Sequence, residues 1–496
     1  MKRVYILSLV ALTSLTLAAH DFEVVNADGK TIYYKGAAGA EENIEVTYRG
    51  TWYGAYENNY SDTIVIPSTV THEGKTYKVI GIGEQAFSIC HNLKSVTIPE
   101  SILYIGDKAF KECYKLEEVN YNAIHANDLS MQEYAPFAAN TMYWHHEEKK
   151  DTDDYFPDYE YQEYGLRKIN IGPKVEHIPA FMFYGMYAMV YKADYTRYKE
   201  TYREADFVVE DSIWGVETID LSGALALRSI GDQAFRSCGA MLEMTIPSHI
   251  TSLGIALFAD CDTLQSVNIQ SQIEVLPSYM FMGCEQLHDI VLPNSIKTLS
   301  YQSFKGCKAL ESITLPNALT TVGPSAFQDC DHLKSVAFSS VLTAIDGYAF
   351  SRCTNLDTIT FPASLQTIGN YAFEDCTVLS DITYGGTPKR IGNFVFSGCR
   401  NLDRGTVNAP RLMPQIKKNT FYGVANTMTV IVDDDVRATY ANDPYWGRFF
   451  APTDLEEVEN GNSAAKSFND GKTLKNGQIF ILKNNKTYNI IGQQVK

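Results

Sequence analysis

Ten cysteines are the residues of this 496-residue chain with the clearest potential for chemistry. A thiol can attack an electrophile, bind a metal or form a disulfide, and the spacing of the cysteines decides among these. The last eight are each 23 residues apart, as are the first two. Such a fixed period is typical of a solenoid in which each repeat is one coil. The ten are Cys90, Cys113, Cys238, Cys261, Cys284, Cys307, Cys330, Cys353, Cys376 and Cys399.

A phenylalanine stands three residues before every cysteine, so the two residue types form parallel columns. Within one coil, Leu310 to Pro316 alternates like a short strand, and Val322 to Phe327 is expected to return as a turn with a helical or 3₁₀ fragment. Coils stacked at about 4.8 Å, the spacing of paired strands, would share one core. The phenylalanines are Phe87, Phe110, Phe235, Phe258, Phe281, Phe304, Phe327, Phe350, Phe373 and Phe396.

Three further coils keep the phenylalanine and lack the cysteine. They contain Phe137, Phe183 and Phe421, so the ten regular coils and these three predict 13 coils. In such a stack the thiols are expected to be buried and free, because side chains one strand apart lie too far apart for good disulfide geometry. Metal binding by the columns is not expected, since no His or Asp is interleaved with them.

Other motifs give no support for catalysis. We find no nucleophile elbow, no phosphate-binding loop and no metalloprotease helix, so the chain is predicted not to be an enzyme and to carry no cofactor or metal. The sequence shows no partner residue that would orient His145 and His146 as metal ligands. Asp433 to Asp435 lack the spacing of a calcium-binding loop and fit a turn better. The formal net charge of -17 argues against nucleic-acid partners.

The termini predict how the chain is divided. A charged start, an apolar run and the small pair Ala18-Ala19 predict a secretory signal peptide over 1–19, with no membrane span in the mature chain. We then expect an N-terminal β cap over 20–78, the coil stack over 79–432, a C-terminal cap over 433–455, a linker over 456–475 and a β tail over 476–496.

The unit Leu310 to Pro316 followed by Val322 to Cys330 resembles the treponeme-type, BspA-like leucine-rich repeat of bacterial surface proteins, here of the Bacteroidetes. The resemblance covers roughly residues 64 to 432. It implies an α/β solenoid: a right-handed stack of leucine-rich coils with a parallel β-sheet on the concave face and a cap at each end. It also implies an exported protein, at the outer-membrane surface or extracellular, that adheres to host or neighbouring-cell proteins, with matrix proteins among the candidates.

Two insertions, 143–165 and 189–215, interrupt consecutive coils just before the strand, so we expect them to lie side by side. They hold much of the tyrosine of the chain, and exposed Tyr and Trp are typical of protein-binding surfaces. Tyr191, Tyr195, Tyr198 and Tyr202 recur at helical spacing, which favours a helix in the second insertion. The candidate binding residues are Trp144, Tyr155, Tyr159, Tyr161, Tyr195 and Tyr198.

Alternatives to this site stay open. The aromatic residues could simply pack on each other and on the solenoid. A second function class is a structural coat or spacer without a specific ligand, and a third, the weakest, is a hydrolase within the insertions. The spacer is compatible with a polar row expected along the strand face, which comprises Ser95, Glu118, Lys168, Ser266, Asp289, Ser312, Ser335, Thr358 and Asp381.

Overall fold

The computed structural model describes residues 20–56, 58–130, 135–137, 166–185, 187–193, 207–450, 472–475, 478–483, 486–489 and 494–495. The predicted signal peptide, all of the first insertion and most of the predicted linker lie outside these residues.

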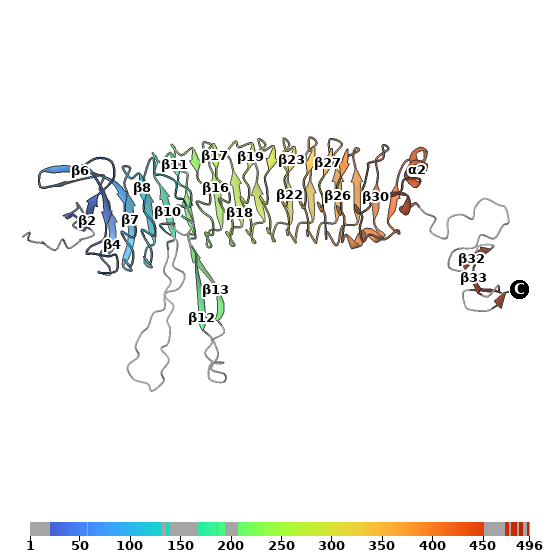
Figure 1. The fold of residues 1–496 in the computed structure, drawn as a ribbon, viewed down its shortest axis with the longest axis horizontal. Helices are drawn as coiled ribbons and strands as arrows, with labels where there is room; N and C mark the ends of the chain where they lie inside the picture. Colours follow the sequence, from blue (N-terminus) through green and yellow to red (C-terminus); the bar gives the residue numbers. More distant parts are fainter. Residues whose placement is uncertain are drawn as a thin grey trace, which may run out of the picture.

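The repeats stack into an elongated solenoid in which each coil adds a strand to a parallel sheet (Figure 1). Alternation builds these strands: in Ser312–Thr314, Ile313 is buried while both neighbours are exposed. The longer strands are β4 (Asp62–Val65), β7 (Leu93–Ile98), β9 (Glu118–Tyr121), β10 (Lys168–Ile171), β14 (Thr218–Asp220), β16 (Glu243–Ile246), β18 (Ser266–Ile269), β20 (Asp289–Val291), β22 (Ser312–Thr314), β24 (Ser335–Ala337), β26 (Thr358–Phe361), β28 (Asp381–Tyr384), β30 (Thr406–Asn408) and β31 (Thr429–Ile431).

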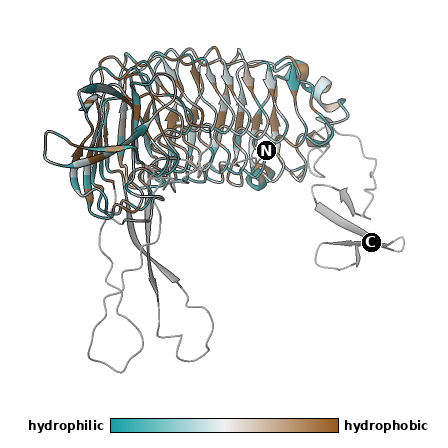
Figure 2. Cartoon of the chain, turned by 60° about the vertical axis from the view of Figure 1, so that its left-hand side comes forward, coloured by the Kyte–Doolittle hydropathy of each residue, from teal (hydrophilic) through white to brown (hydrophobic). Residues whose placement is uncertain are grey.

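A second series of two-residue strands runs along another side of the stack, and these strands also pair in parallel. Figure 2 shows apolar and polar positions recurring from coil to coil. The short strands are β8 (Tyr104–Ile105), β11 (His177–Ile178), β15 (Ser229–Ile230), β17 (Ser252–Leu253), β19 (Val275–Leu276), β21 (Thr298–Leu299), β23 (Thr321–Val322), β25 (Ala344–Ile345), β27 (Thr367–Ile368) and β29 (Arg390–Ile391).

The return side of each coil consists of turns, so the expected helical or 3₁₀ fragment there is wrong. In the coil of Phe327, Ser325 and Asp329 have φ of 54° and 63°. Two left-handed residues four positions apart reverse the chain sharply and cannot belong to a right-handed helix. The described residues contain one α-helix, α2 (Asp434–Ala441), and the 3₁₀ helices η2 (Arg400–Arg404) and η3 (Gly447–Phe449). The α/β class is therefore corrected to a parallel β-solenoid.

The phenylalanines form one continuous column of rings through the core. Phe304 and Phe327 stack with centroids 5.1 Å apart and planes at 1°, and both are fully buried. Consecutive rings lie within stacking distance from Phe87 to Phe421, through the coils of Phe137 and Phe183 that lack cysteine. The core is therefore a line along the stack, to which every coil contributes one ring.

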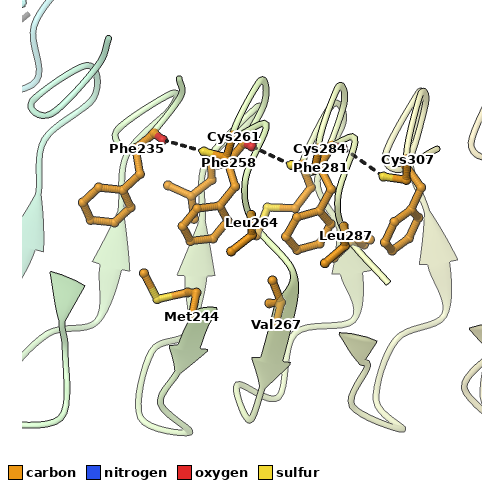
Figure 3. Packing of buried hydrophobic residues seen from close by; sticks show 14 of the residues in the cluster. Phe235, Met244, Phe258, Cys261, Leu264, Val267, Phe281, Cys284, Leu287 and Cys307 are labelled. Atoms are coloured by element: carbon orange, nitrogen blue, oxygen red, sulfur yellow. Dashed lines mark hydrogen bonds between the residues drawn. The ribbon is translucent and has the colours of Figure 1, made fainter. Parts of the chain in front are cut away.

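The ten cysteines are all buried and none forms a disulfide. From the second coil onward, each Sγ–H points at the carbonyl oxygen of the phenylalanine one coil earlier; Cys284 donates to Phe258 at 3.0 Å and Cys307 to Phe281 at 3.2 Å (Figure 3). Burial raises the pKa of the Cys261 thiol to about 12. The thiols therefore act as small apolar side chains that also donate a weak hydrogen bond.

Five strands at the N-terminal side of the stack lie in one sheet: β1 (Phe22–Val25), β2 (Thr31–Gly36), β3 (Asn43–Thr47), β5 (Thr69–His72) and β6 (Lys75–Ile82). The β5–β6 hairpin turns at Glu73 and Gly74, whose φ values of 48° and 79° are those of a tight hairpin turn. The end of β6 pairs in parallel with β3 and β8, which joins this sheet to the short-strand series. Tyr60 lies against Phe87, with centroids 4.4 Å apart, and continues the ring column beyond its first phenylalanine.

The C-terminal side of the stack meets α2 and η3. Trp446 and Phe449 lie 5.4 and 5.5 Å from the ring of Phe421, and the indole N–H of Trp446 donates to the carbonyl of Pro414 at 3.0 Å. Beyond them, β32 (Lys472–Lys475), β33 (Gln478–Lys483), β34 (Lys486–Asn489) and β35 (Gln494–Val495) form an antiparallel sheet. Because β32 falls within 456–475, the expectation of a linker reaching residue 475 is wrong.

Candidate interaction surface beside the two insertions

Both insertions belong to neighbouring strands of the long-strand sheet. The first separates β9 from β10 and the second separates β10 from β14, yet these strands pair directly in the order β14-β10-β9. Ile169 of β10 is opposite Val119 and Ile219, and all three side chains are buried. The stack is thus continuous across both insertions, because each interrupted coil returns in register.

The described ends of the second insertion form an antiparallel pair, β12 (Tyr187–Ala193) with β13 (Phe207–Gly215), so Tyr191, the first residue of the expected helix, lies in a strand. The other tyrosines of that expected helix lie outside the described residues. Both segments are rich in aromatic and β-branched residues, which favour extended backbone over helix. Figure 1 shows this pair projecting sideways from the stack near β10.

The six candidate binding residues all lie outside the described residues: Trp144, Tyr155, Tyr159 and Tyr161 in the first insertion, and Tyr195 and Tyr198 in the second. His145 and His146 lie there too. The shared aromatic patch therefore stays a prediction.

The exposed face of the three adjoining strands carries a polar network. The side-chain amide of Asn170 donates to Glu118 Oε1 at 2.7 Å and to Asn120 Oδ1 at 2.8 Å. Lys168 Nζ lies 3.4 Å from the same Glu118 oxygen. Since Lys168 and Glu118 are opposite each other in register, the network links strands that are 50 residues apart in sequence.

Asp220 extends this polar face onto β14. Hydrogen bonds from the hydroxyl and backbone N–H of Ser222, together with the charge of Lys168, hold the pKa of Asp220 below its usual range. Asn120, Asn170 and Asp220 are not part of the predicted polar row. The alternation of side chains along a strand predicts them, because each lies two residues after an outward-facing residue and therefore on the same face of its strand.

The predicted polar row continues in register beyond this network. Ser266 is opposite both Glu243 and Asp289, Ser312 is opposite Ser335, and Thr358 is opposite Asp381. In this part of the row only Glu243, Asp289 and Asp381 carry charge, and no basic residue balances them. The charged groups of both signs are therefore gathered beside the insertions, on β9 and β10.

The described parts of the chain offer no alternative site of metal chemistry. No group of three or more His, Cys, Asp or Glu side chains in them is placed to hold a metal ion. Asp433 precedes α2, with Asp434 and Asp435 in its first turn, and Arg411 pairs with Asp433 and Asp435. None of the described helices is both long and apolar enough to cross a bilayer.

A stack of leucine-rich coils joined by parallel strands defines the class of this protein as a leucine-rich-repeat solenoid. The model of the BspA type leucine rich repeat region matches in six copies, over residues 53–189, 215–334 and 320–442. These matches cover well over half of the chain, which therefore belongs to the BspA-type leucine-rich-repeat family.

Several solved structures are similar to the chain. A leucine-rich repeat protein from Bacteroides ovatus is 20% identical, with 83% of this chain and 99% of that chain covered and a TM-score of 0.45. A leucine rich cell surface protein from Faecalibacterium prausnitzii is 18% identical, with 83% and 98% covered and a TM-score of 0.39. The pneumococcal vaccine antigen PcpA is 16% identical, with 84% and 95% covered and a TM-score of 0.44. No curated protein matches the chain.

Proposed function

We propose that this protein is an exported, non-enzymatic recognition module that binds a protein partner through the two insertions and the adjoining face of β9, β10 and β14. The observation that carries the proposal is the β12–β13 pair, which projects from an otherwise uniform stack. A solenoid needs no such projection for stability, since its coils already share one core. Segments that leave a rigid scaffold are where binding residues concentrate.

The polar face beside the insertions supports the same proposal. Lys168 is exposed and Glu118 is partly exposed, and the two form an ion pair across neighbouring strands, so both charged groups can also meet a partner. Such charged groups at the rim of an interface favour the correct orientation of a partner more than they add affinity. Tyrosines on the insertions would supply the buried anchors.

The partner class is an extracellular or host protein, with matrix proteins among the candidates. The family is one of bacterial surface proteins, which supports an interaction outside the cell. A location at the outer-membrane surface or in the medium is part of the same proposal. The net charge of -17 disfavours nucleic acid as partner.

The experiment is a binding assay of the purified chain against immobilised matrix proteins and host-cell surface extract. We expect the chain to capture one class of protein. Two separate variants, Lys168→Glu and Glu118→Lys, should each lose this capture. A matched control changes Thr358→Lys, at the same outward position far along the stack. Equal loss in the control would refute a site beside the insertions, and no capture at all would favour the alternative function, a surface coat or spacer.

A further inference from the structure

A row of aromatic side chains lies on the outside of the return turns, apart from the buried phenylalanine column. Tyr348, Tyr371 and Phe394 follow the short strands β25, β27 and β29 at the 23-residue period. The rings of Tyr348 and Tyr371 lie 4.8 Å apart with planes at 6°, and those of Tyr371 and Phe394 lie 5.0 Å apart at 7°. Tyr422 continues the row, 5.5 Å from Phe394. We call these four residues the aromatic ridge.

The aromatic ridge is open to solvent. Tyr348 is 40% and Tyr422 is 60% exposed, and the two rings between them are half-buried. Parallel rings in contact are about 3.5 to 4.0 Å apart, so centroids at 4.8 and 5.0 Å mean that the rings are offset. Each ring therefore covers only part of the face of its neighbour. Among the described residues, none forms a hydrogen bond with the hydroxyls of Tyr348, Tyr371 and Tyr422.

The turn position of the ridge is unfavourable for an aromatic residue. Tyr348, Tyr371 and Phe394 have φ of 58°, 59° and 57°, in the left-handed region that bulky side chains avoid. Gln302 and Ser325 occupy the same position in the two preceding coils, with φ of 55° and 54°. The rings are therefore not needed to form the turn. Backbone strain that is retained in this way is typical of functional sites.

The ridge is one residue wide, which favours a narrow, linear ligand. A stable protein interface buries about 800 Å² per partner, whereas a whole aromatic side chain offers about 150 to 250 Å² and these rings are partly covered. An extended peptide would need free backbone groups, but the N–H groups of Tyr348 and Tyr371 already donate to the carbonyls of Asn370 and Asn393, both at 3.0 Å. A sugar chain requires only apolar faces and hydroxyl partners, and the ridge has both.

The charges beside Tyr348 and Tyr371 favour a neutral sugar chain over an acidic one. Nη2 of Arg352 donates to Asp329 Oδ2 at 2.8 Å, so this cation is already paired. Burial, Tyr371 and Glu374 together raise the pKa of Tyr348, so its hydroxyl stays protonated and can donate. The carboxylate of Glu374 would repel an acidic sugar at the same place.

We propose that the aromatic ridge binds a neutral, extended, β-linked glycan that lies along the stack. Rings at steps of 4.8 to 5.5 Å are close to the advance of one sugar unit in such a chain, whereas α-linked glucans coil away from a straight ridge. The C–H faces of the sugars would pack on the uncovered parts of the rings, and their hydroxyls would bond to the phenol groups of Tyr348 and Tyr371. This site is separate from the β9, β10 and β14 face and independent of the proposed protein binding.

The test is affinity electrophoresis of the full chain in native gels that contain hydroxyethylcellulose, with titration calorimetry against cellohexaose. We expect the gel to retard the unmodified chain, and the affinity to fall about 10-fold in each of Tyr348→Gln and Tyr371→Gln. Both variants should melt nearly like the unmodified chain, because Gln302 already occupies the equivalent position with the same sign of φ. Tyr371→Phe keeps the ring and should lose less affinity.

Phe181→Gln is the matched control, because Phe181 has the same turn position, with φ of 57°, and lies outside the ridge. This variant should bind the glycan at full strength, as should Lys168→Glu, which tests the protein-binding face separately. The proposal is overturned if a chain that melts normally is not retarded, if Phe181→Gln loses as much affinity as Tyr371→Gln, or if the acidic glycan polygalacturonate retards the chain more strongly. Loss of protein capture with unchanged glycan binding in Tyr371→Gln would also overturn it and assign the ridge to a protein.

Discussion

The Sγ–H of Cys307 donates to the carbonyl oxygen of Phe281 at 3.2 Å, and the backbone N–H of Cys284 donates to the same carbonyl at 3.2 Å. One phenylalanine carbonyl thus accepts from a cysteine of its own coil and from a cysteine of the next. The Sγ–H contact recurs at each cysteine-containing coil from Cys238 to Cys399. The cysteine column therefore connects consecutive coils, without any bond between sulfurs.

The first prediction concerns the thiols and pH. Burial raises the pKa of Cys90 and Cys261 to about 12, from the ordinary thiol value of 9.0. Because the folded pKa lies above the unfolded one, the stabilising contribution is complete below pH 9 and is lost as pH rises toward 12. We expect the native chain to resist iodoacetamide at neutral pH, and its denaturation midpoint to fall from pH 9 upward. Rapid alkylation of the native chain would contradict this prediction.

The second prediction concerns the ring column. Phe304 is fully buried between Phe281 and Phe327, with centroids at 5.4 and 5.1 Å. Phe304→Ala removes contacts on both sides and leaves a cavity, so we expect it to lower the free energy of unfolding by about 3 to 5 kcal/mol. Denaturant unfolding followed by circular dichroism measures this change. Phe304→Leu, which keeps most of the volume, serves as the control and should lose less.

The third prediction concerns the left-handed turns. Gly306 has φ of +76°, and a Cβ added there would meet its nearest atom, the Gly283 nitrogen, at 3.7 Å. Space is therefore adequate, and Gly306→Ala should lower stability by about 1 kcal/mol through backbone strain alone. Ser237 occupies the equivalent position with φ of 58°. Ser237→Gly should raise the denaturation midpoint slightly; a change of the same sign in both variants would refute strain as the cause.

The fourth prediction concerns the first insertion. Deletion of residues 145–162 should abolish capture of the protein partner while the melting temperature changes little, because β9 and β10 pair in register on either side of it. Each lost aromatic anchor would be worth about 2 kcal/mol or more of binding energy. Calorimetric melting and the capture assay are run on the same preparation. Full-strength capture by the deletion variant would place the site on the polar row instead.

The sequence by itself determined the period, the inward residues and the free thiols of this protein. A repeat of 23 residues must place equal positions one above another, and burial of apolar side chains such as Phe304 and Leu310 then follows without knowledge of the coil path. The register of the polar row, such as Ser312 opposite Ser335, follows from the same period.

Tertiary structure alone decided the backbone of the turns and the contacts across the insertions. Left-handed residues such as Gln302 carry no residue-type signal, because the stack holds them in place against their own preference. The contacts of Asn170 with Asn120 and of His177 with Ser229 join residues 50 and 52 positions apart, off the regular period. They exist only because each interrupted coil returns in register, and that return is determined by packing against the neighbouring coils, not by spacing along the chain.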